Sequence, residues 1–114
     1  MNLAELREQY RRDLFDDFLP FMDRFVIDHE HGGFLCHADR DGTRLGEEKD
    51  SWYTGRGIWV YAFLYRHLTR DPRHLEVARK AAAFALRIRP ADDARWPRTF
   101  TSTGDTLAPD GEIY

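Results

Sequence analysis

The chain has 114 residues, enough for one small domain with a single hydrophobic core. Its 42% hydrophobic and 32% charged residues are typical of globular proteins, and a net charge of −3 gives no broad basic surface for nucleic acid or an anionic membrane. The negative mean hydropathy excludes a membrane protein, whereas the 14% aromatic share is high and calls for an explanation.

The cysteine content and the N-terminal residues indicate the cellular compartment. Cys36 is the only cysteine, so no disulfide can form within the chain. Nothing near Met1 resembles a secretion signal, and we expect a cytoplasmic protein. No acid or base is spaced to activate Cys36, which predicts a buried structural cysteine.

The first 26 residues predict a helix from about Asn2 to about Val26. Apolar residues recur there at steps of three and four, the spacing of one stripe on a helix. They are Leu3, Leu6, Tyr10, Leu14, Phe18, Met22 and Phe25. Pro20 lacks an N–H and clashes with the preceding turn, so the helix should kink or restart near Leu19.

Residues 32–43 predict a small hairpin, because a short apolar run is followed by Asp41-Gly42, a pair suited to tight turns. A second helix is expected from Trp52 to Leu68. Its apolar residues lie on two faces, which predicts an inner helix covered on most sides. They are Trp52, Trp59 and Phe63 on one face and Ile58, Ala62, Tyr65 and Leu68 on the other.

A third, more exposed helix should begin at Asp71-Pro72, an N-cap and first-turn signal, and end before Pro90. Its expected apolar face is Leu75, Ala78, Ala82, Ala85 and Ile88, with Arg79, Lys80, Arg87 and Arg89 largely off that face. Strand formers from Trp96 to Thr101 and turn residues at 104–105 and 109–111 predict a second hairpin.

The expected order of helix, hairpin, helix, helix and hairpin suggests paired helices joined by turns on one side and β-hairpins on the other. The chain stops at Ile113-Tyr114 with neither a polar tail nor a cap, which favours a single partial domain, residues 1–114, truncated at its C-terminus. Helix faces meant for missing neighbours would be exposed, so we expect self-association into homo-oligomers.

The candidate site is Arg56 between Gly55 and Gly57. Each glycine in a helix costs about 1 kcal/mol relative to alanine, which close packing or room for a ligand would offset. Arg56 shares a helix face with Trp52 and Trp59. Indole rings suit the C–H faces of a sugar, and a guanidinium donates hydrogen bonds to its oxygens. Spacing alone leaves open a purely structural Arg-Trp stack.

Metal sites are not expected. The set His29, His31, His37, Asp39 and Asp41 lacks zinc-type spacing and reads as solvated turn residues. The segment 37–48 resembles a calcium loop, but His37 stands at the first ligand position and Arg44 where an apolar residue belongs. A hairpin turn explains this segment better.

Four motifs, in order and spacing, resemble the opening of N-acylglucosamine 2-epimerase family proteins. They are Pro20-Phe21, His31-Gly32-Gly33-Phe34, Asp39-Arg40-Asp41-Gly42 and the stretch from Trp52 to Trp59. The resemblance implies a mainly α fold with short β-hairpins, the N-terminal portion of an (α/α)6 barrel whose inner helices line a sugar pocket. It implies a sugar 2-epimerase or aldose–ketose isomerase.

By the same resemblance, Arg56 binds the sugar and stabilises the enediolate formed when a base removes the proton beside the carbonyl. Trp52 and Trp59 would complete the substrate site, with no cofactor and no metal. The proton-transferring histidines of the family lie in later helices, so this segment alone should be inactive. Two alternatives stay open: a glycan hydrolase on another α/α barrel, and a helical binding module.

Overall fold

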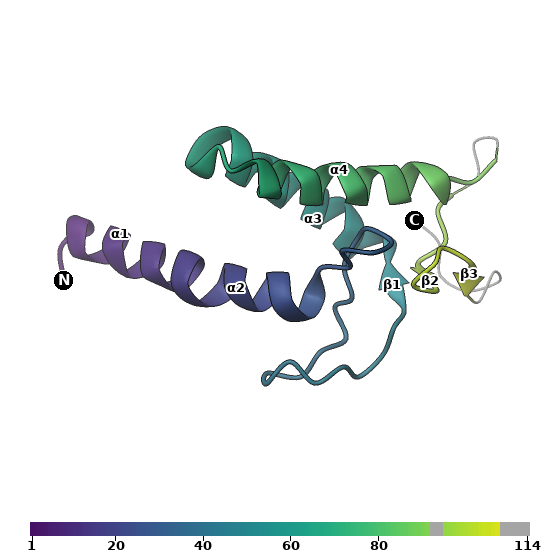
Figure 1. Ribbon diagram of the computed structural model, residues 1–114, viewed down its shortest axis with the longest axis horizontal. Helices are drawn as coiled ribbons and strands as arrows, with labels where there is room; N and C mark the ends of the chain where they lie inside the picture. Colours follow the sequence, from purple (N-terminus) through teal and green to yellow (C-terminus); the bar gives the residue numbers. More distant parts are fainter. Residues whose placement is uncertain (92–94, 108–114) are drawn as a thin grey trace.

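The computed structural model describes residues 1–91 and 95–107. Two long helical runs, one further helix and three short strands make up the described fold (Figure 1). The first run consists of α1 (Leu3–Arg12), η1 (Asp13–Phe18), α2 (Leu19–Phe21) and η2 (Met22–Val26), where η marks π-helical turns. The rest are β1 (Lys49–Asp50), α3 (Ser51–Phe63), η3 (Leu64–Thr69), α4 (Pro72–Arg87), β2 (Thr99–Phe100) and β3 (Thr106–Leu107).

The first helical run confirms the predicted helix to Val26, but it does not restart near Leu19. Asn2 and Glu5 form a reciprocal capping box at its start. Leu19 keeps right-handed helical angles, with φ −64° and ψ −41°, and its N–H bonds the carbonyl of Leu14, five residues back. Wider π turns flank Pro20, so the helix continues past the residue that lacks a backbone donor.

The segment 32–43 forms a turn but no regular hairpin. Only isolated bridges occur there, Ile27 with Phe34 and Ala38 with Arg44. The predicted turn is present, with Gly42 at φ +93° and the Asp39 carbonyl accepting from its N–H at 2.9 Å. Backbone hydrogen bonds from the Asp39 N–H to the Thr43 carbonyl and from the Leu45 N–H to the His37 carbonyl flank the second bridge. The chain therefore reverses direction as predicted, but it pairs through a single bridge rather than through two strands.

The second hairpin is confirmed by β2 and β3, which pair antiparallel with Phe100 opposite Thr106. The predicted turn at 109–111 and residues 112–114 lie outside the described residues. The sequence did not predict β1, which adds a third antiparallel strand by pairing Lys49 with Phe100. This sheet closes one end of the α3–α4 pair (Figure 1).

Helix α3 was predicted to be covered on most sides, and in this chain that prediction is wrong. Between Ser51 and Thr69 only Thr54, Tyr61 and Leu64 are buried, because α4 and the loop before β1 pack on one side alone. The remaining aromatic face is exposed, including Trp59 and Phe63.

Helix α4 begins as predicted, with the Asp71 carboxylate accepting from the N–H of Arg73. Its buried face is rotated from the prediction, since Leu75 is exposed and Phe84 is fully buried. The buried residues are Val77, Ala78, Ala81 and Phe84. Contact with Lys49, whose Nζ lies 4.3 Å from the Phe84 ring centre, helps select this face.

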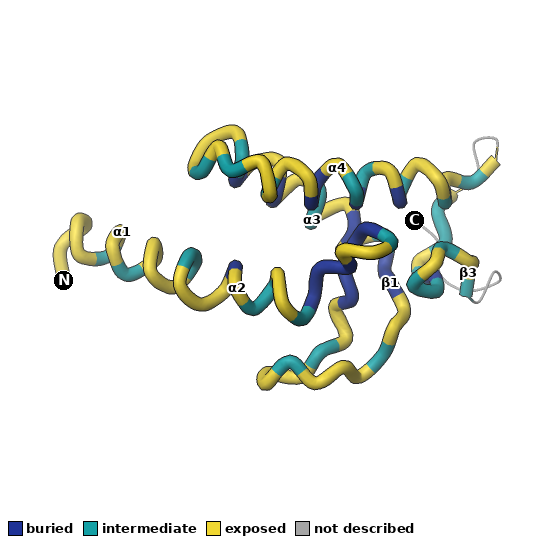
Figure 2. The backbone as a smooth tube through the Cα atoms, viewed as in Figure 1, coloured by how far each residue is buried: buried dark blue, intermediate teal, exposed yellow. Residues whose placement is uncertain are grey.

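The core lies where the end of the first run, the following loop and the α3–α4 pair meet (Figure 2). It contains Leu19, Val26, Ile27, Phe34, Tyr61, Leu64, Val77, Ala78 and Ala81. Cys36 is exposed, so the prediction of a buried cysteine is wrong: the chain leaves the core after Leu35. Among residues 1–91 and 95–107, no helix has the length and apolar character needed to cross a membrane.

Candidate functional site

The start of α3, which carries Arg56, is held by hydrogen bonds from both sides. The Asp50 carboxylate caps the helix by accepting from the N–H groups of Trp52 at 2.7 Å and Tyr53 at 3.3 Å. Ser51 donates through its hydroxyl to the Pro97 carbonyl at 2.6 Å. These contacts fix where the first turn of the helix sits relative to β2.

Immediately before this cap, Lys49 forms a buried polar network that sequence reasoning missed. Its Nζ donates to Asp28 Oδ2 at 2.7 Å, to the Gly32 carbonyl at 2.6 Å and to the Ser102 carbonyl at 2.8 Å. Lys49 is 1% exposed, so all three ammonium donors are satisfied inside the protein. No local sequence signal could reveal the network, because its partners come from two distant segments, the loop that contains Asp28 and Gly32 and the turn that contains Ser102.

The surroundings shift the pKa of both Asp28 and Lys49 from their ordinary values. Burial alone would raise the pKa of Asp28, but hydrogen bonds from Lys49 and from the N–H groups of His31 and Glu30 outweigh it and lower the pKa. Burial lowers the pKa of Lys49, although Asp28 opposes that change. The geometry supports a charged pair, since the ammonium has no other counter-ion within the network.

The structure brings Arg56 and Trp52 together, as their spacing predicted. The guanidinium carbon of Arg56 lies 4.6 Å from the centre of the Trp52 ring, a cation–π distance. Arg56 is exposed and Trp52 is 53% exposed, so this contact lies at the surface of the chain. Within residues 1–91 and 95–107, Arg56 forms no ion pair, which leaves its hydrogen-bond donors accessible to a ligand.

Trp59 lies two turns further along the same face but pairs with a different neighbour. Its ring stacks on Phe63 with centres 5.2 Å apart, and Phe63 in turn contacts His67 at 4.6 Å. Trp59 is 65% exposed. We call Trp52, Arg56, Trp59, Phe63 and His67 the aromatic stripe of α3 and η3. It explains part of the high aromatic content as an exposed surface rather than as core.

The two glycines that flank Arg56 have different surroundings, so a different physical reason accounts for each. A methyl group on Gly57 would overlap the Phe34 ring, so Gly57 permits close packing. A methyl group on Gly55 would meet nothing within 4 Å. Gly55 instead borders a cavity of about 540 Å³ between the start of α3 and the end of α4, which Trp52 and Trp96 also line. Of the two explanations offered for these glycines, close packing therefore accounts for Gly57, and room for a ligand is possible only beside Gly55.

The histidines of the loop pair with separate carboxylates. His29 Nε2 lies 3.1 Å from Asp23 Oδ1, His31 Nδ1 lies 3.4 Å from Asp28 Oδ2, and His37 Nε2 lies 3.6 Å from Glu48 Oε1. In the described part of the chain, no three His, Cys, Asp or Glu side chains are grouped to hold a metal ion.

Comparisons with known proteins connect this arrangement to sugar epimerases. No protein-family model matches the chain. The N-acylglucosamine 2-epimerase of Mus musculus is 42% identical over 74 residues, which are 63% of this chain and 18% of that protein. The Homo sapiens protein is 40% identical over 88 residues, 75% of this chain and 20% of that protein. The chain thus spans about a fifth of the length of these relatives.

Solved structures of sugar epimerases are also similar to this chain. The cellobiose 2-epimerase of Spirochaeta thermophila DSM 6192 superposes with a TM-score of 0.72 and 29% identity over 92% of this chain and 26% of that chain. The cellobiose 2-epimerase of Bacillus thermoamylovorans B4167 gives 0.78 over 92% of this chain and 27% of that chain, and at 21% identity it shows the fold alone. The chain therefore has the mostly helical fold of a segment of sugar epimerases. Its predicted resemblance to the N-acylglucosamine 2-epimerase family is confirmed.

Proposed function

We propose that this chain is the N-terminal part of an (α/α)6-barrel sugar 2-epimerase or aldose–ketose isomerase, and that Arg56 binds the sugar. The observation that carries the proposal is the exposed Arg56 guanidinium over Trp52, with no ion-pair partner among the described residues. The names of the relatives, N-acylglucosamine 2-epimerase and cellobiose 2-epimerase, favour epimerisation over the hydrolase and binding-module alternatives.

The chemistry assigned to Arg56 follows from the reaction class. Removing the proton next to a sugar carbonyl places negative charge on the carbonyl oxygen, and a guanidinium donates two hydrogen bonds to such an oxygen. Arg56 would therefore bind the enediolate more strongly than the sugar, which is the condition for lowering the barrier. Trp52 and Trp59 would present ring faces to the sugar's C–H groups.

The acid and base of the reaction would come from other helices of a longer protein. His29 pairs with Asp23, His31 with Asp28 and His37 with Glu48, away from the aromatic stripe. His74 contacts Tyr61 on another face of the helix. His67, the histidine of the stripe, packs on Phe63 and lies about three helical turns beyond Arg56. We therefore propose that the segment alone binds sugar weakly and does not epimerise it. The same proposal includes a cytoplasmic location, a small-molecule sugar substrate and no cofactor.

The test is a chimera in which this chain replaces the matching segment of the mouse N-acylglucosamine 2-epimerase. Arg56→Ala should lower kcat/KM on N-acetylglucosamine by about 10²–10³, the usual loss when one oxyanion donor is removed. Arg56→Lys should restore only part of it, because an ammonium lacks the planar fork. Arg66→Ala, an exposed arginine on the same helical run, is the matched control. Equal activity in Arg56→Ala and Arg66→Ala would refute the role.

A binding measurement on the 114-residue chain separates sugar contact from catalysis. Quenching of tryptophan fluorescence by N-acetylglucosamine should weaken in Arg56→Ala and persist in Arg66→Ala, since Trp52 contacts Arg56 directly. Epimer formation, followed by proton exchange with deuterated water, should be undetectable in the chain alone.

A further inference from the structure

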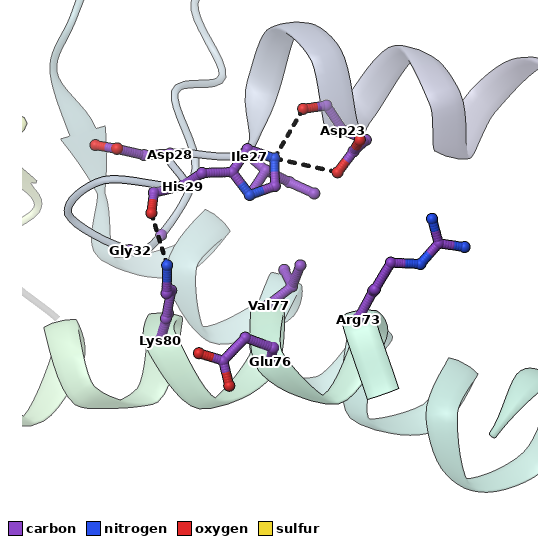
Figure 3. Close-up of a pocket in the computed structure, with 10 residues that line it drawn as sticks. Asp23, Ile27, Asp28, His29, Gly32, Arg73, Glu76, Val77 and Lys80 are labelled. Atoms are coloured by element: carbon purple, nitrogen blue, oxygen red, sulfur yellow. Dashed lines mark hydrogen bonds and ion pairs between the residues drawn. The ribbon is translucent and has the colours of Figure 1, made fainter. Parts of the chain in front are cut away.

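A second cavity, of about 440 Å³, lies between the first helical run and the start of α4. Phe15, Leu19 and Pro20 line it from the first run, while Thr69 and His74 line it from the other side. It adjoins a smaller hollow of about 260 Å³, shown in Figure 3, with which it shares Asp23, Ile27, Arg73 and Val77.

The cavity wall contains the one buried side-chain polar atom without a hydrogen bond in the described part of the chain, the hydroxyl of Tyr61. Tyr61 is 3% exposed. Its ring is fixed by stacking on Phe34 at 5.8 Å and by an edge contact with His74 at 5.9 Å. A buried hydroxyl without a partner is costly, and native proteins nearly always supply one. The hydroxyl is therefore a buried donor in the cavity wall whose hydrogen bond a ligand could complete.

Asp23 faces the same space from the first helical run. Burial and then the negative charge of Asp23 raise the pKa of Tyr61 to about 12, so the phenol keeps its proton and stands within electrostatic reach of the carboxylate. Asp23 uses Oδ1 to meet the His29 ring at 3.1 Å (Figure 3). A donor of Tyr61 and an acceptor of Asp23 thus border one cavity.

The size and charge of the cavity limit the chemical class of ligand that it can hold. A single water occupies about 30 Å³ of liquid, so a volume of about 440 Å³ is enough for several waters or for one small molecule that displaces them. Cavities of about 300–1,000 Å³ hold small molecules. Arg73 also lines the cavity, but its positive charge is paired with Asp71 at 2.8 Å. The negative charge of Asp23 therefore disfavours an anionic ligand. A hydroxyl group both accepts and donates, and so satisfies Tyr61 and Asp23 together.

We propose that this cavity binds a neutral polyhydroxylated compound, a sugar or sugar alcohol, whose hydroxyl accepts from Tyr61 and donates to Asp23. The apolar side chains of Phe15, Leu19 and Pro20 contact the ligand's C–H groups. Tyr61 follows Arg56 by five residues, about 140° around the helix, so the site lies on another face than the aromatic stripe. It stands whether or not the proposed epimerase function is correct.

The test is a titration of the 114-residue protein with sorbitol and with methyl α-D-glucopyranoside, followed by amide shifts in ¹H–¹⁵N NMR spectra. We expect shifts at Thr69, His74 and Val77, with a Kd of about 1 mM or tighter. Tyr61→Phe removes only the hydroxyl and should raise the Kd about tenfold, while the shifts persist in Arg56→Ala. Tyr65→Phe, which removes a hydroxyl from the same helical run outside the cavity, should leave the Kd unchanged.

A second arm tests the role of Asp23. Dimethoxyethane offers oxygen acceptors but no hydroxyl donors, so it should not shift the same amides. Asp23→Asn should weaken sorbitol binding while the spectrum stays that of a folded protein. The proposal is overturned if neither polyol shifts these amides, if Tyr61→Phe binds as well as the unsubstituted protein, or if the shifts appear only at Trp52, Arg56 and Trp59.

Discussion

Lys49 and Asp28 form a buried ion pair with Nζ 2.7 Å from Oδ2, although 21 residues separate them in the sequence. The pair joins the loop after the first helical run to β1, and β1 leads directly into α3. The stability of this one contact therefore bears on the position of the helix that carries Arg56.

Lys49→Met should lower the free energy of unfolding by about 3–5 kcal/mol, because it leaves the Asp28 charge buried without its counter-ion. The carbonyls of Gly32 and Ser102 also lose their donor. Urea denaturation followed by circular dichroism measures the change. Lys80→Met is the control: Lys80 is half-buried, and within residues 1–91 and 95–107 it donates to the His29 carbonyl alone, so this variant should cost about 1 kcal/mol. Equal losses in both variants would contradict a special role for Lys49.

Acid should destabilise the protein through Asp28. Its pKa is lower in the folded state than the unfolded value of about 3.9, so ionised Asp28 contributes stability that is present above about pH 4. That contribution is lost as the pH falls through the lowered pKa. Urea unfolding between about pH 5 and about pH 2 should show the decline, and Asp28→Asn should flatten it. An unchanged pH profile in Asp28→Asn would place the acid sensitivity elsewhere.

The two glycines beside Arg56 should respond oppositely to alanine. Gly55→Ala adds a methyl into open space and should raise the free energy of unfolding by about 0.5–1 kcal/mol through helix propensity. Gly57→Ala drives a methyl into the Phe34 ring and should lower it by about 1–3 kcal/mol. Each variant is the other's control in urea denaturation. Similar shifts in the same direction would contradict the packing difference.

Loss of the α3 cap should loosen the start of the candidate site. Asp50→Ala removes the acceptor for the N–H groups of Trp52 and Tyr53 and should cost about 1 kcal/mol. Amide hydrogen exchange should quicken at these two residues before it does so in α4. Asp39→Ala, in the exposed loop, serves as the control. Unchanged exchange at Trp52 would show that β1 alone holds the helix start.

The aromatic stripe should promote self-association, since Trp59 is 65% and Phe63 is 40% exposed on one helix face. Sedimentation velocity of the 114-residue chain should reveal dimers or larger species that diminish in Trp59→Ser/Phe63→Ser. Leu3→Ser/Tyr10→Ser, two exposed positions on α1, is the matched control. A monodisperse monomer at high concentration would refute this expectation.

Local features of this chain were predictable. The period of apolar residues predicted the helical runs, and Asp71 capped α4 where its side chain and the following proline indicated. The spacing of Trp52 and Arg56 placed them in contact. Each of these depends on residues within one or two turns of one another, so the sequence contains the necessary information.

The buried faces were less predictable. Helix α4 buries Phe84 rather than exposing it, because Lys49 and the glycines at 33 and 104 lie against its ring. Helix α3 has covering neighbours on one side alone, so its apolar content did not translate into burial. An apolar stripe indicates that a helix can pack against other elements, but the position of those elements determines which of its residues are buried.

The sequence by itself determined the helices, the second hairpin, the family resemblance and Arg56 as the candidate sugar contact. The tertiary structure alone decided that Lys49 is buried with Asp28, that Gly57 makes room for Phe34, and that Tyr61 faces a cavity. The physical reason is range: caps and helical periodicity act over a few residues, while Lys49 meets partners 17, 21 and 53 residues away. Only the folded chain brings such groups within hydrogen-bond distance.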